Sequence, residues 1–181
     1  MWYTRKGDDG TTGSFGTKER MKKSSLRAEG LGSLDELNSW LGLVKVKSGS
    51  LGALLGIDPT DLVHRLQSDL FIIQAELAGA EMTIGEEKVT WLEAVTDAAE
   101  KEVPPLTGFS IAGGTELSAL FDIARTQARK TERAVLRAGE DGHEVGSGSK
   151  QYLNRLSSVL FALARLSNSR GGITERSPEY R

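Results

Sequence analysis

The sequence predicts an all-α fold, a five-helix up-and-down bundle with ferritin-like packing behind an extended, glycine-rich N-terminal segment. Between residues 33 and 168, apolar residues recur at steps of three and four, the period of an α-helix, in five separate stretches. The sequence shows neither the alternating pattern of a strand nor an internal repeat. We therefore expect one domain over residues 1–181, with an N-terminal segment at 1–30, a helical bundle at 31–168 and a flexible tail at 169–181.

The first helix is predicted to run from Ser33 to about Val46. Ser33 and Glu36 have the spacing of a capping box, in which each side chain bonds the other residue's backbone N–H. Asp35 would then lie in the first turn, where a carboxylate suits the helix dipole. A glycine- and serine-broken loop is expected at 47–57.

The other helices are bounded by residues that start or stop helices. Asp58 and Pro59 are expected to begin the second helix, and the third is predicted over about 86–102. Thr115 can cap the fourth helix, whose apolar stripe continues past residue 131. A glycine-rich connection at 138–148 then leads to the fifth helix.

Composition excludes several classes of protein. The chain has 181 residues, a net charge of −2 and no cysteine, so disulfides and cysteine metal sites are excluded. No apolar run approaches the roughly 18 residues of a membrane span, and the N-terminus does not resemble a signal peptide. We therefore expect a soluble, cytoplasmic protein that binds neither membranes nor nucleic acid. Residues 1–30 carry seven basic and four acidic residues, which favours a local anion site there.

The N-terminal segment suits a polyphosphate ligand. Glycines at 7, 10, 13 and 16 alternate with hydroxyl and basic residues, and glycine lets backbone N–H groups approach phosphate oxygens. The segment has no Walker A spacing, because Lys18 comes one position too late after Gly16. A flexible tail with incidental glycines is the alternative.

A second candidate region follows the loop that begins at Gly108. Arg125, Arg129 and Glu132 fall at i, i+4 and i+7 beside the apolar stripe of the fourth helix, so they share one edge of that helix. Lys130 and Arg133 add two cations nearby. A solvated face with local salt bridges would have the same pattern.

Six blocks of this sequence, in order, resemble the PduO-type ATP:cob(I)alamin adenosyltransferases. They lie within residues 3–168, so the resemblance covers nearly the whole chain. The blocks are residues 4–10, 32–38, 66–71, 109–115, 124–133 and 152–157.

The resemblance implies a homotrimer with ATP and corrinoid bound at each subunit interface. It implies an enzyme in which the cobalt of cob(I)alamin attacks the 5′ carbon of ATP, giving adenosylcobalamin and triphosphate. Mg²⁺ would be bound mainly through the ATP phosphates, with no permanently bound cofactor. A corrinoid reductase and an adenosylcobalamin-dependent enzyme are implied as possible partners. The alternative is a non-catalytic trimer that binds ATP or corrinoid as a carrier or sensor.

The resemblance also implies roles for individual residues. Asp35 would pair across the interface with Arg125, and Phe109 would occupy the lower face of the corrin, where it displaces the axial base. Lys23 is similar to the family's phosphate-binding lysine, with Lys22 as an alternative because residues 17–23 hold one extra position. The N-terminal ATP-binding residues would be Thr4, Arg5, Lys6, Gly7, Thr12 and Gly13, and the helical ones Arg129, Lys130, Thr131, Glu132, Arg133 and Asn154. Glu132 either orients an arginine or holds the ribose.

Two residues depart from the family pattern, and one short motif could be mistaken for a cobalt-ligating site. Ala112 stands where the family usually has proline, and Lys130 replaces a common arginine and so lacks the bidentate fork. Residues 141–146 match a cobalt-ligating motif, but that motif needs a strand-to-helix turn. Here it falls between two predicted helices, so we interpret the match as coincidental.

Overall fold

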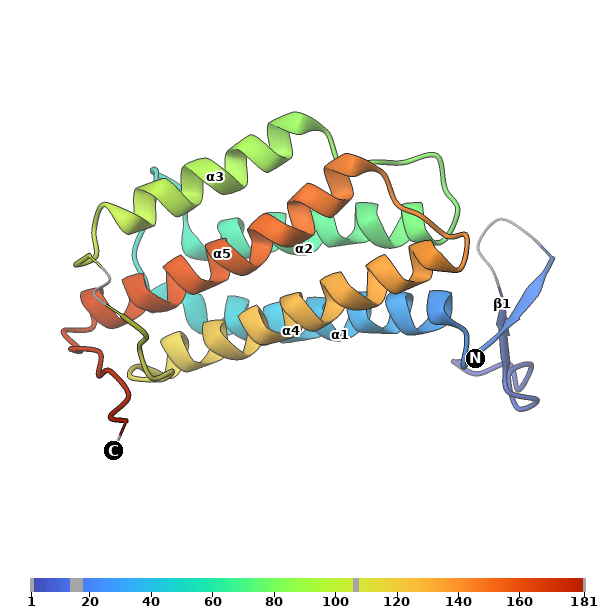
Figure 1. Cartoon of the computed structure of the whole chain (residues 1–181), viewed down its shortest axis with the longest axis horizontal. Helices are drawn as coiled ribbons and strands as arrows, with labels where there is room; N and C mark the ends of the chain where they lie inside the picture. The colour runs from blue at the N-terminus through green and yellow to red at the C-terminus, as the bar shows by residue number, and fades with distance from the viewer. Residues whose placement is uncertain (1, 14–17, 106–107, 181) are drawn as a thin grey trace.

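Five α-helices form an up-and-down bundle in the computed structural model, which describes residues 2–13, 18–105 and 108–180 (Figure 1). A short 3₁₀ turn, η1 (Ser48–Ser50), and two short strands complete the regular structure of these residues. The predicted all-α bundle is therefore confirmed. The helices are α1 (Leu26–Lys47), α2 (Pro59–Leu77), α3 (Glu86–Glu100), α4 (Glu116–Glu140) and α5 (Ser147–Arg170).

Helix α4 lies between α1 and α5, while α2 packs on α1 and α3 packs on α5. The apolar stripe predicted for α4 is buried, and its alanines let the neighbouring helices approach closely. The stripe consists of Leu117, Phe121, Ala124, Ala128, Thr131 and Val135. Since these residues face the core, the arginines between them are left at the edge of α4.

The predicted start of the first helix is wrong. Helix α1 begins at Leu26, and the Ser25 side chain caps it by accepting a hydrogen bond from the Ala28 N–H at 3.2 Å. Ser33 is buried inside the helix, so it is no cap, and Asp35 lies well past the first turn. The glycine at 30 fits because a Cβ there would stand 3.0 Å from the Leu77 side chain.

The other helix starts agree with the sequence prediction. Asp58 accepts from the Thr60 N–H at 2.8 Å with Pro59 in the first turn, and Thr115 accepts from the Ser118 N–H at 3.0 Å. The ends differ by a few residues. Helix α4 continues to Glu140, and α5 continues through Arg170, so residues 169 and 170 belong to the bundle and not to the tail.

The N-terminal segment contains a small sheet, which the sequence did not predict. Strands β1 (Thr11–Gly13) and β2 (Arg20–Lys22) pair antiparallel, with Thr12 opposite Met21. We call residues 2–13 and 18–25 the N-terminal arm; Gly16 of the glycine series lies outside the described residues.

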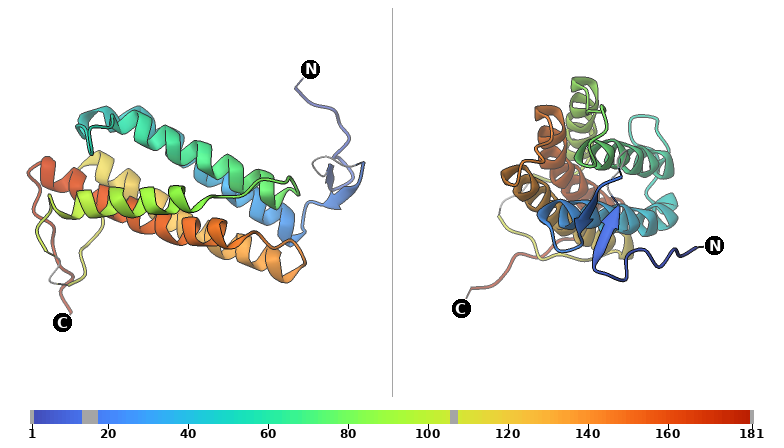
Figure 2. Two further views of the ribbon diagram at one scale, coloured as in Figure 1. Left: turned by 90° about the horizontal axis from the view of Figure 1, so that it is seen from above. Right: turned by 90° about the vertical axis from the view of Figure 1, so that its right-hand side faces the viewer.

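The N-terminal arm and the loop before α4 lie at opposite ends of the bundle. The arm extends from the start of α1, whereas residues 108–115 and the C-terminal segment lie at the far end of the long axis (Figures 1 and 2). Of the helices in the described residues, none is both long and apolar enough to cross a bilayer.

Candidate functional site

A groove between the antiparallel helices α4 and α5 brings together most of the predicted helical site residues. The Arg125 guanidinium lies 5.8 Å from the centre of the Phe161 ring. One turn further along α4, Arg129 lines a pocket with Ser157 and Ser158 of α5. Another turn on, the Asn154 Nδ2 donates to Glu132 Oε1 at 3.3 Å. We call this line of contacts the α4–α5 groove.

One end of the groove is aromatic and has its charges paired. A pocket of about 470 Å³ is lined there by Phe109, Phe161 and two arginines, among others. Arg125 Nε lies 3.0 Å from Asp122 Oδ1, and Arg165 Nε lies 2.9 Å from Glu175 Oε2. Phe109 is 81% exposed, so its ring is available to a ligand. Two neutralised ion pairs beside two aromatic rings suit a large, flat ligand without strong net charge.

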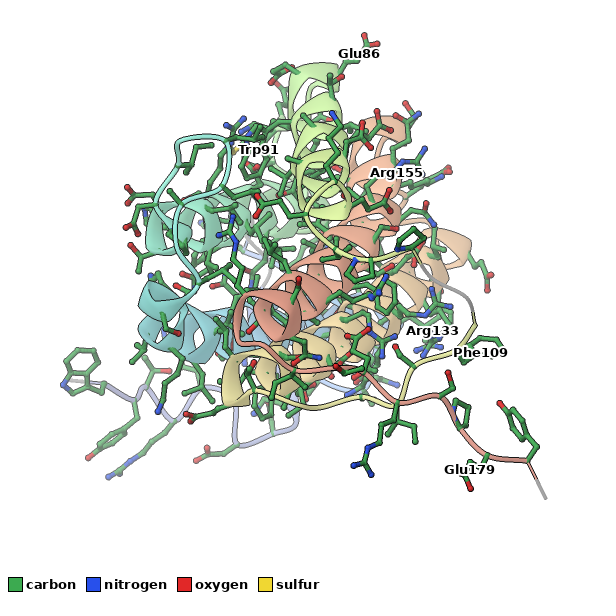
Figure 3. The ribbon with its side chains drawn as sticks, turned by 90° about the vertical axis from the view of Figure 1, so that its left-hand side faces the viewer. Glu86, Trp91, Phe109, Arg133, Arg155 and Glu179 are labelled. Carbon is green, nitrogen blue, oxygen red and sulfur yellow. The ribbon has the colours of Figure 1, made fainter. Side chains whose placement is uncertain are left out.

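The other end of the groove carries the exposed Arg129, and we call it the cationic end, although Glu100 of α3 lines the same pocket. Among the described residues, neither Arg129 nor Arg133 makes an ion pair, whereas Lys130 Nζ lies 3.0 Å from Glu36 Oε2. The hydrogen bond from Lys130 lowers the pKa of the Glu36 carboxyl. Arg133 lies on the same flank of the bundle as Phe109 in the end-on view (Figure 3). Unpaired guanidiniums at this end favour an anionic ligand.

The two ends adjoin each other. The pocket at Arg129, of about 300 Å³, is also lined by Arg125 and Phe161, which line the aromatic pocket as well. A ligand at the cationic end would therefore lie next to one at the aromatic end.

Thr131 does not fit the role predicted for it. Its side chain is fully buried, and its hydroxyl donates to the Ser33 carbonyl at 2.9 Å. Position 131 falls on the apolar stripe of α4, so the side chain packs against α1 and does not reach the groove. A direct contact between the Thr131 side chain and ATP is therefore inconsistent with this structure.

Asp35 and Arg125 are not joined within the chain. Asp35 is exposed on α1, and its carboxylate makes no ion pair with any described residue, while Arg125 pairs with Asp122 of its own helix. Their pairing across a subunit interface remains a prediction.

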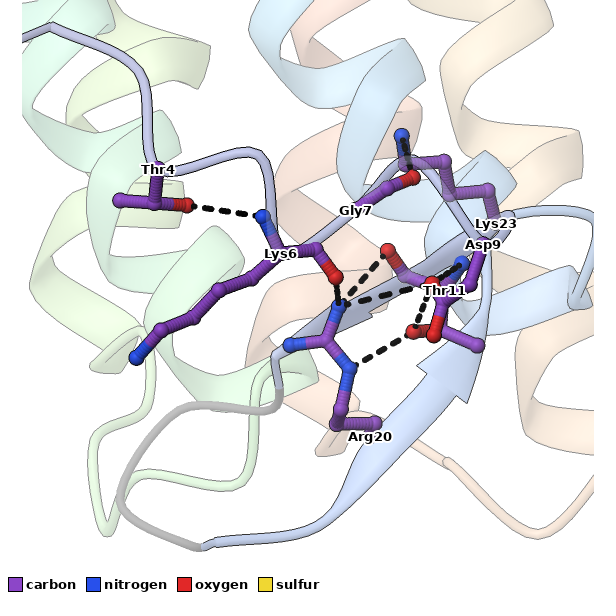
Figure 4. A network of polar contacts seen from close by, with 7 residues as sticks. All are labelled: Thr4, Lys6, Gly7, Asp9, Thr11, Arg20 and Lys23. Carbon is purple, nitrogen blue, oxygen red and sulfur yellow. Dashed lines mark hydrogen bonds and ion pairs between the residues drawn. The ribbon is translucent and has the colours of Figure 1, made fainter.

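The N-terminal arm is held by its own basic residues (Figure 4). Lys23 Nζ donates to the Gly7 carbonyl at 2.9 Å, and Arg20 Nε donates to Thr11 Oγ1 at 2.6 Å. Arg20 also donates to the Lys6 carbonyl and lies 3.8 Å from Asp9. Gly7 leaves room for this closure, because a Cβ there would make a tight 3.0 Å contact with the Thr11 carbonyl oxygen.

The predicted ATP-binding residues therefore form two separate groups. Thr4 accepts from the Lys6 N–H at 3.4 Å, and Arg5, Gly7, Thr12 and Gly13 lie in the same arm. The hydrogen bonds of Thr4, Arg20 and Lys23 all stay within the arm and do not reach the α4–α5 groove. One chain alone does not bring the two groups together.

Several residues of this site were not predicted from the sequence. Asp122 could have been found, since it precedes Arg125 by three positions on a helix. Arg20 is one of seven basic residues in the first 30, and no local pattern distinguishes it from the others. Phe161, Arg165 and Glu175 carried no local signal, because their roles depend on which helices meet.

The described residues offer no evident resident metal centre. They contain no cluster of three or more His, Cys, Asp or Glu side chains that could hold an ion. His143 lies in the turn between α4 and α5, where the strand-to-helix context of a cobalt-ligating motif is missing.

A helical bundle with this groove is suited to hold a large ring beside an anion, and comparisons with known proteins identify the family. Residues 2–167 match the model of the cobalamin adenosyltransferase family. The corrinoid adenosyltransferase of Bacillus subtilis is 40% identical over 178 residues, covering 94% of this chain and 88% of that protein. That of Mycobacterium tuberculosis is 34% identical over 189 residues, covering 96% and 92%. The chain belongs to the cobalamin adenosyltransferase family.

Solved structures agree with this assignment. A PduO-type ATP:corrinoid adenosyltransferase from Lactobacillus reuteri, a phenylalanine-to-alanine variant complexed with cobalamin and ATP, superposes with a TM-score of 0.85 at 29% identity over 96% of each chain. An arginine-to-lysine variant from the same organism, complexed with ATP, superposes with a TM-score of 0.88 at 28% identity, covering 98% of this chain and 99% of that one.

Proposed function

We propose that this protein transfers the 5′-deoxyadenosyl group of ATP to the cobalt of a corrinoid such as cob(I)alamin, and releases triphosphate. Membership of the family supports the reaction class. The observation that carries the proposal for this chain is the charge pattern of the α4–α5 groove. Arginines are paired with carboxylates at the aromatic end, near Phe109, and unpaired at the other end, near Arg129.

The reaction explains why the groove needs cations and no general base. The electron pair of Co(I) forms the bond to C5′, and the electrons of the C5′–O bond leave with the triphosphate, so cobalt becomes Co(III) and no proton moves. Charge develops on the leaving group. In this proposal Arg129 and Arg133 stabilise that charge, and removing one such group typically costs about 10²–10³ in rate.

Phe109 acts at an earlier step in this proposal. Its ring would occupy the lower face of the corrinoid in place of the axial ligand. A cobalt without that ligand is easier to reduce from Co(II) to Co(I), because the half-filled axial cobalt orbital that accepts the electron is lowered in energy. The exposure of the ring and the neighbouring neutral ion pairs support this assignment.

We further propose that Mg²⁺ arrives with the ATP phosphates. The absence of a carboxylate or histidine cluster in the described residues suits a metal held mainly by its nucleotide. A cytoplasmic location belongs to the same proposal, because Co(I) persists only where strong reductants are supplied.

We propose that the active assembly is a homotrimer in which the N-terminal arm completes a neighbour's site. The hydrogen bonds of Lys23 and Arg20 stay within the arm, which lies at the bundle end opposite Phe109, and neither residue reaches the groove of its own chain (Figure 1). Partly or largely exposed apolar side chains on α1 and α4 would be covered by such an assembly. They include Leu43, Val46, Ile123 and Leu136.

An activity assay tests the reaction. The protein is incubated with ATP, Mg²⁺ and chemically reduced cobalamin, while Co–C bond absorbance and released triphosphate are measured against a protein-free control. Equal amounts of adenosylcobalamin and triphosphate are expected. Tight binding of ATP or corrinoid without turnover would instead indicate a carrier or sensor.

A mixing experiment tests the shared site. An arm variant, Lys23→Ala, and a groove variant, Arg129→Ala, are each expected to be nearly inactive. After subunit exchange, random 1:1 mixing should restore about a quarter of the sites, because a site needs one intact arm and one intact groove from neighbouring subunits. If arm and groove act within one chain, mixing restores nothing.

A further inference from the structure

The Glu175 carboxylate and the Ile173 N–H, which donates to the Asn168 carbonyl at 2.9 Å, tie the segment that follows α5 to that helix. Glu175 Oε2 accepts from Arg165 Nε at 2.9 Å, and Glu175 Oε1 accepts from Asn168 Nδ2 at 3.0 Å. The Arg165 and Glu175 side chains are only 12% and 18% exposed, so water screens this pair less than a surface ion pair. Both carboxylate oxygens are thus used to hold the segment on α5.

Asn168 connects this carboxylate to the loop that carries Phe109. Its side chain donates to the Gly113 carbonyl at 2.9 Å and accepts from the Thr115 N–H at 3.0 Å. Asn168 is 2% exposed, so Glu175 holds one donor of a buried amide. At Gly114, where φ is +124°, a Cβ would stand 2.3 Å from Asn168 Oδ1, and only glycine permits this approach.

A second connection lies on the other side of the loop. The Ile111 N–H donates to the Arg176 carbonyl at 2.8 Å. Arg176 directly follows Glu175, and Ile111 lies two residues after Phe109. The loop is therefore held at 111 and at 113–115, and both attachments lead back to Glu175.

Phe109 depends on these attachments for its position. Its side chain is largely exposed, so packing does not fix it, and the backbone of its loop must do so. Glu175 and Phe109 also line the same aromatic pocket. A change at Glu175 therefore alters the position of the loop and of the Phe109 ring that it carries.

We propose that Glu175 is a positioning residue for Phe109, acting through Arg165, Asn168 and the Arg176 backbone. This inference rests on the proposed function. It predicts that loss of the carboxylate impairs the step that needs Phe109 beneath the corrinoid, the reduction of Co(II), more than the transfer of the adenosyl group.

The first test compares Glu175→Ala and Glu175→Gln with Glu102→Gln. Glu102 is a matched control, since it also pairs with an arginine of α5, Arg170 at 2.7 Å, at the same end of the bundle but without a bond to the loop. In both Glu175 variants, turnover from Co(II) should fall about tenfold or more, as is typical for lost supporting contacts. The absorption of four-coordinate Co(II) should fall with it. Turnover from pre-reduced Co(I) and the KM for ATP should change less than about twofold, and Glu102→Gln should resemble wild type in all four measurements.

A double-mutant cycle separates positioning from general loosening. In a Phe109→Ala background, Glu175→Ala should cause no further loss of turnover from Co(II), because the group it positions is gone. An equal loss in both backgrounds, or an equal loss from Co(I) and Co(II), would overturn the inference. So would Glu175 variants that behave like Glu102→Gln. If wild type binds corrinoid but never turns over, the proposed function fails instead, and the Co(II) spectrum still tests Glu175.

Discussion

The Thr131 hydroxyl donates a buried hydrogen bond to the Ser33 carbonyl, 2.9 Å away across the interface of α4 and α1. Both residues are buried, so this bond links two long helices where no water competes for it. It places position 131 in the core, although Lys130 and Arg133 close to it in sequence are exposed.

Thr131→Val should therefore weaken folding and leave ATP binding unchanged. Valine keeps the shape but lacks the hydroxyl, so we expect the free energy of unfolding to fall by about 1 kcal/mol. Denaturant unfolding and the KM for ATP measure the two effects. Thr126→Val is the control, because Thr126 is exposed on the same helix and its hydroxyl donates to the nearby Ile123 carbonyl at 2.8 Å. A raised KM at unchanged stability would return Thr131 to the ATP site.

Arg129→Ala should abolish most of the activity without unfolding the protein. Arg129 is exposed at the cationic end of the groove and makes no ion pair with another described residue, so no internal partner is lost. We expect kcat to fall by about 10²–10³, as for other lost transition-state contacts, with an unchanged melting temperature. Arg137→Ala, two turns further along α4, should behave like wild type. Near-normal turnover of Arg129→Ala would remove this arginine from the site.

Phe109→Ala should lower turnover from Co(II) more than turnover from Co(I). If the ring displaces the axial ligand, activity that starts from Co(II) will fall far more than activity that starts from pre-reduced Co(I). Parallel assays with and without prior chemical reduction give the ratio. Phe71→Ala, which removes another exposed phenylalanine on α2, should change neither rate. Equal losses for Phe109→Ala would contradict the axial role.

Lys23 and Lys22 can be distinguished as phosphate ligands. Lys23 Nζ already points into the arm, at the Gly7 carbonyl, whereas Lys22 belongs to β2 opposite Thr11. Lys23→Ala should therefore raise the KM for ATP more than Lys22→Ala. Titration calorimetry with ATP checks the ranking, and a larger effect at position 22 would reverse the assignment.

Most of the bundle could be predicted from the sequence because helix periods and caps are local signals. Thr115 and Asp58 cap their helices as expected. The capping-box spacing at Ser33 gave the wrong helix start because the same spacing also occurs inside a helix. Only tertiary structure shows that the glycine at 30 allows close contact with Leu77.

The candidate site was predictable along α4 and less so elsewhere. The spacing of Arg125 and Arg129 follows from one helix and was visible in the sequence. The contacts of Glu175 depend on where the chain returns after α5, and no local pattern encodes that. The arm lies far from the Phe109 loop, and its position likewise depends on the direction in which the chain enters α1 (Figure 2).

The buried tyrosine of α5 should limit the stability of the fold at alkaline pH, and this can be tested. Tyr152 donates to Asp69 at 3.1 Å, and Lys88 also bonds that carboxylate. Burial, and then the negative charge of Asp69, raises the pKa of Tyr152 well above its usual value. The folded protein thus keeps the Tyr152 proton at a pH where the unfolded chain, with a pKa of about 10, loses it. The stabilisation is present below that pH and is lost as pH rises past it.

The free energy of unfolding should therefore fall above a pH of about 10, with a slope that includes up to about 1.4 kcal/mol per pH unit from Tyr152. Tyr152→Phe should remove that part of the slope, although it is less stable at neutral pH because Asp69 loses a donor. Denaturant unfolding at a series of alkaline pH values measures both effects. Tyr180→Phe, at an exposed position, should keep the wild-type slope. Identical slopes for Tyr152→Phe and wild type would show that the buried hydroxyl does not set the alkaline limit.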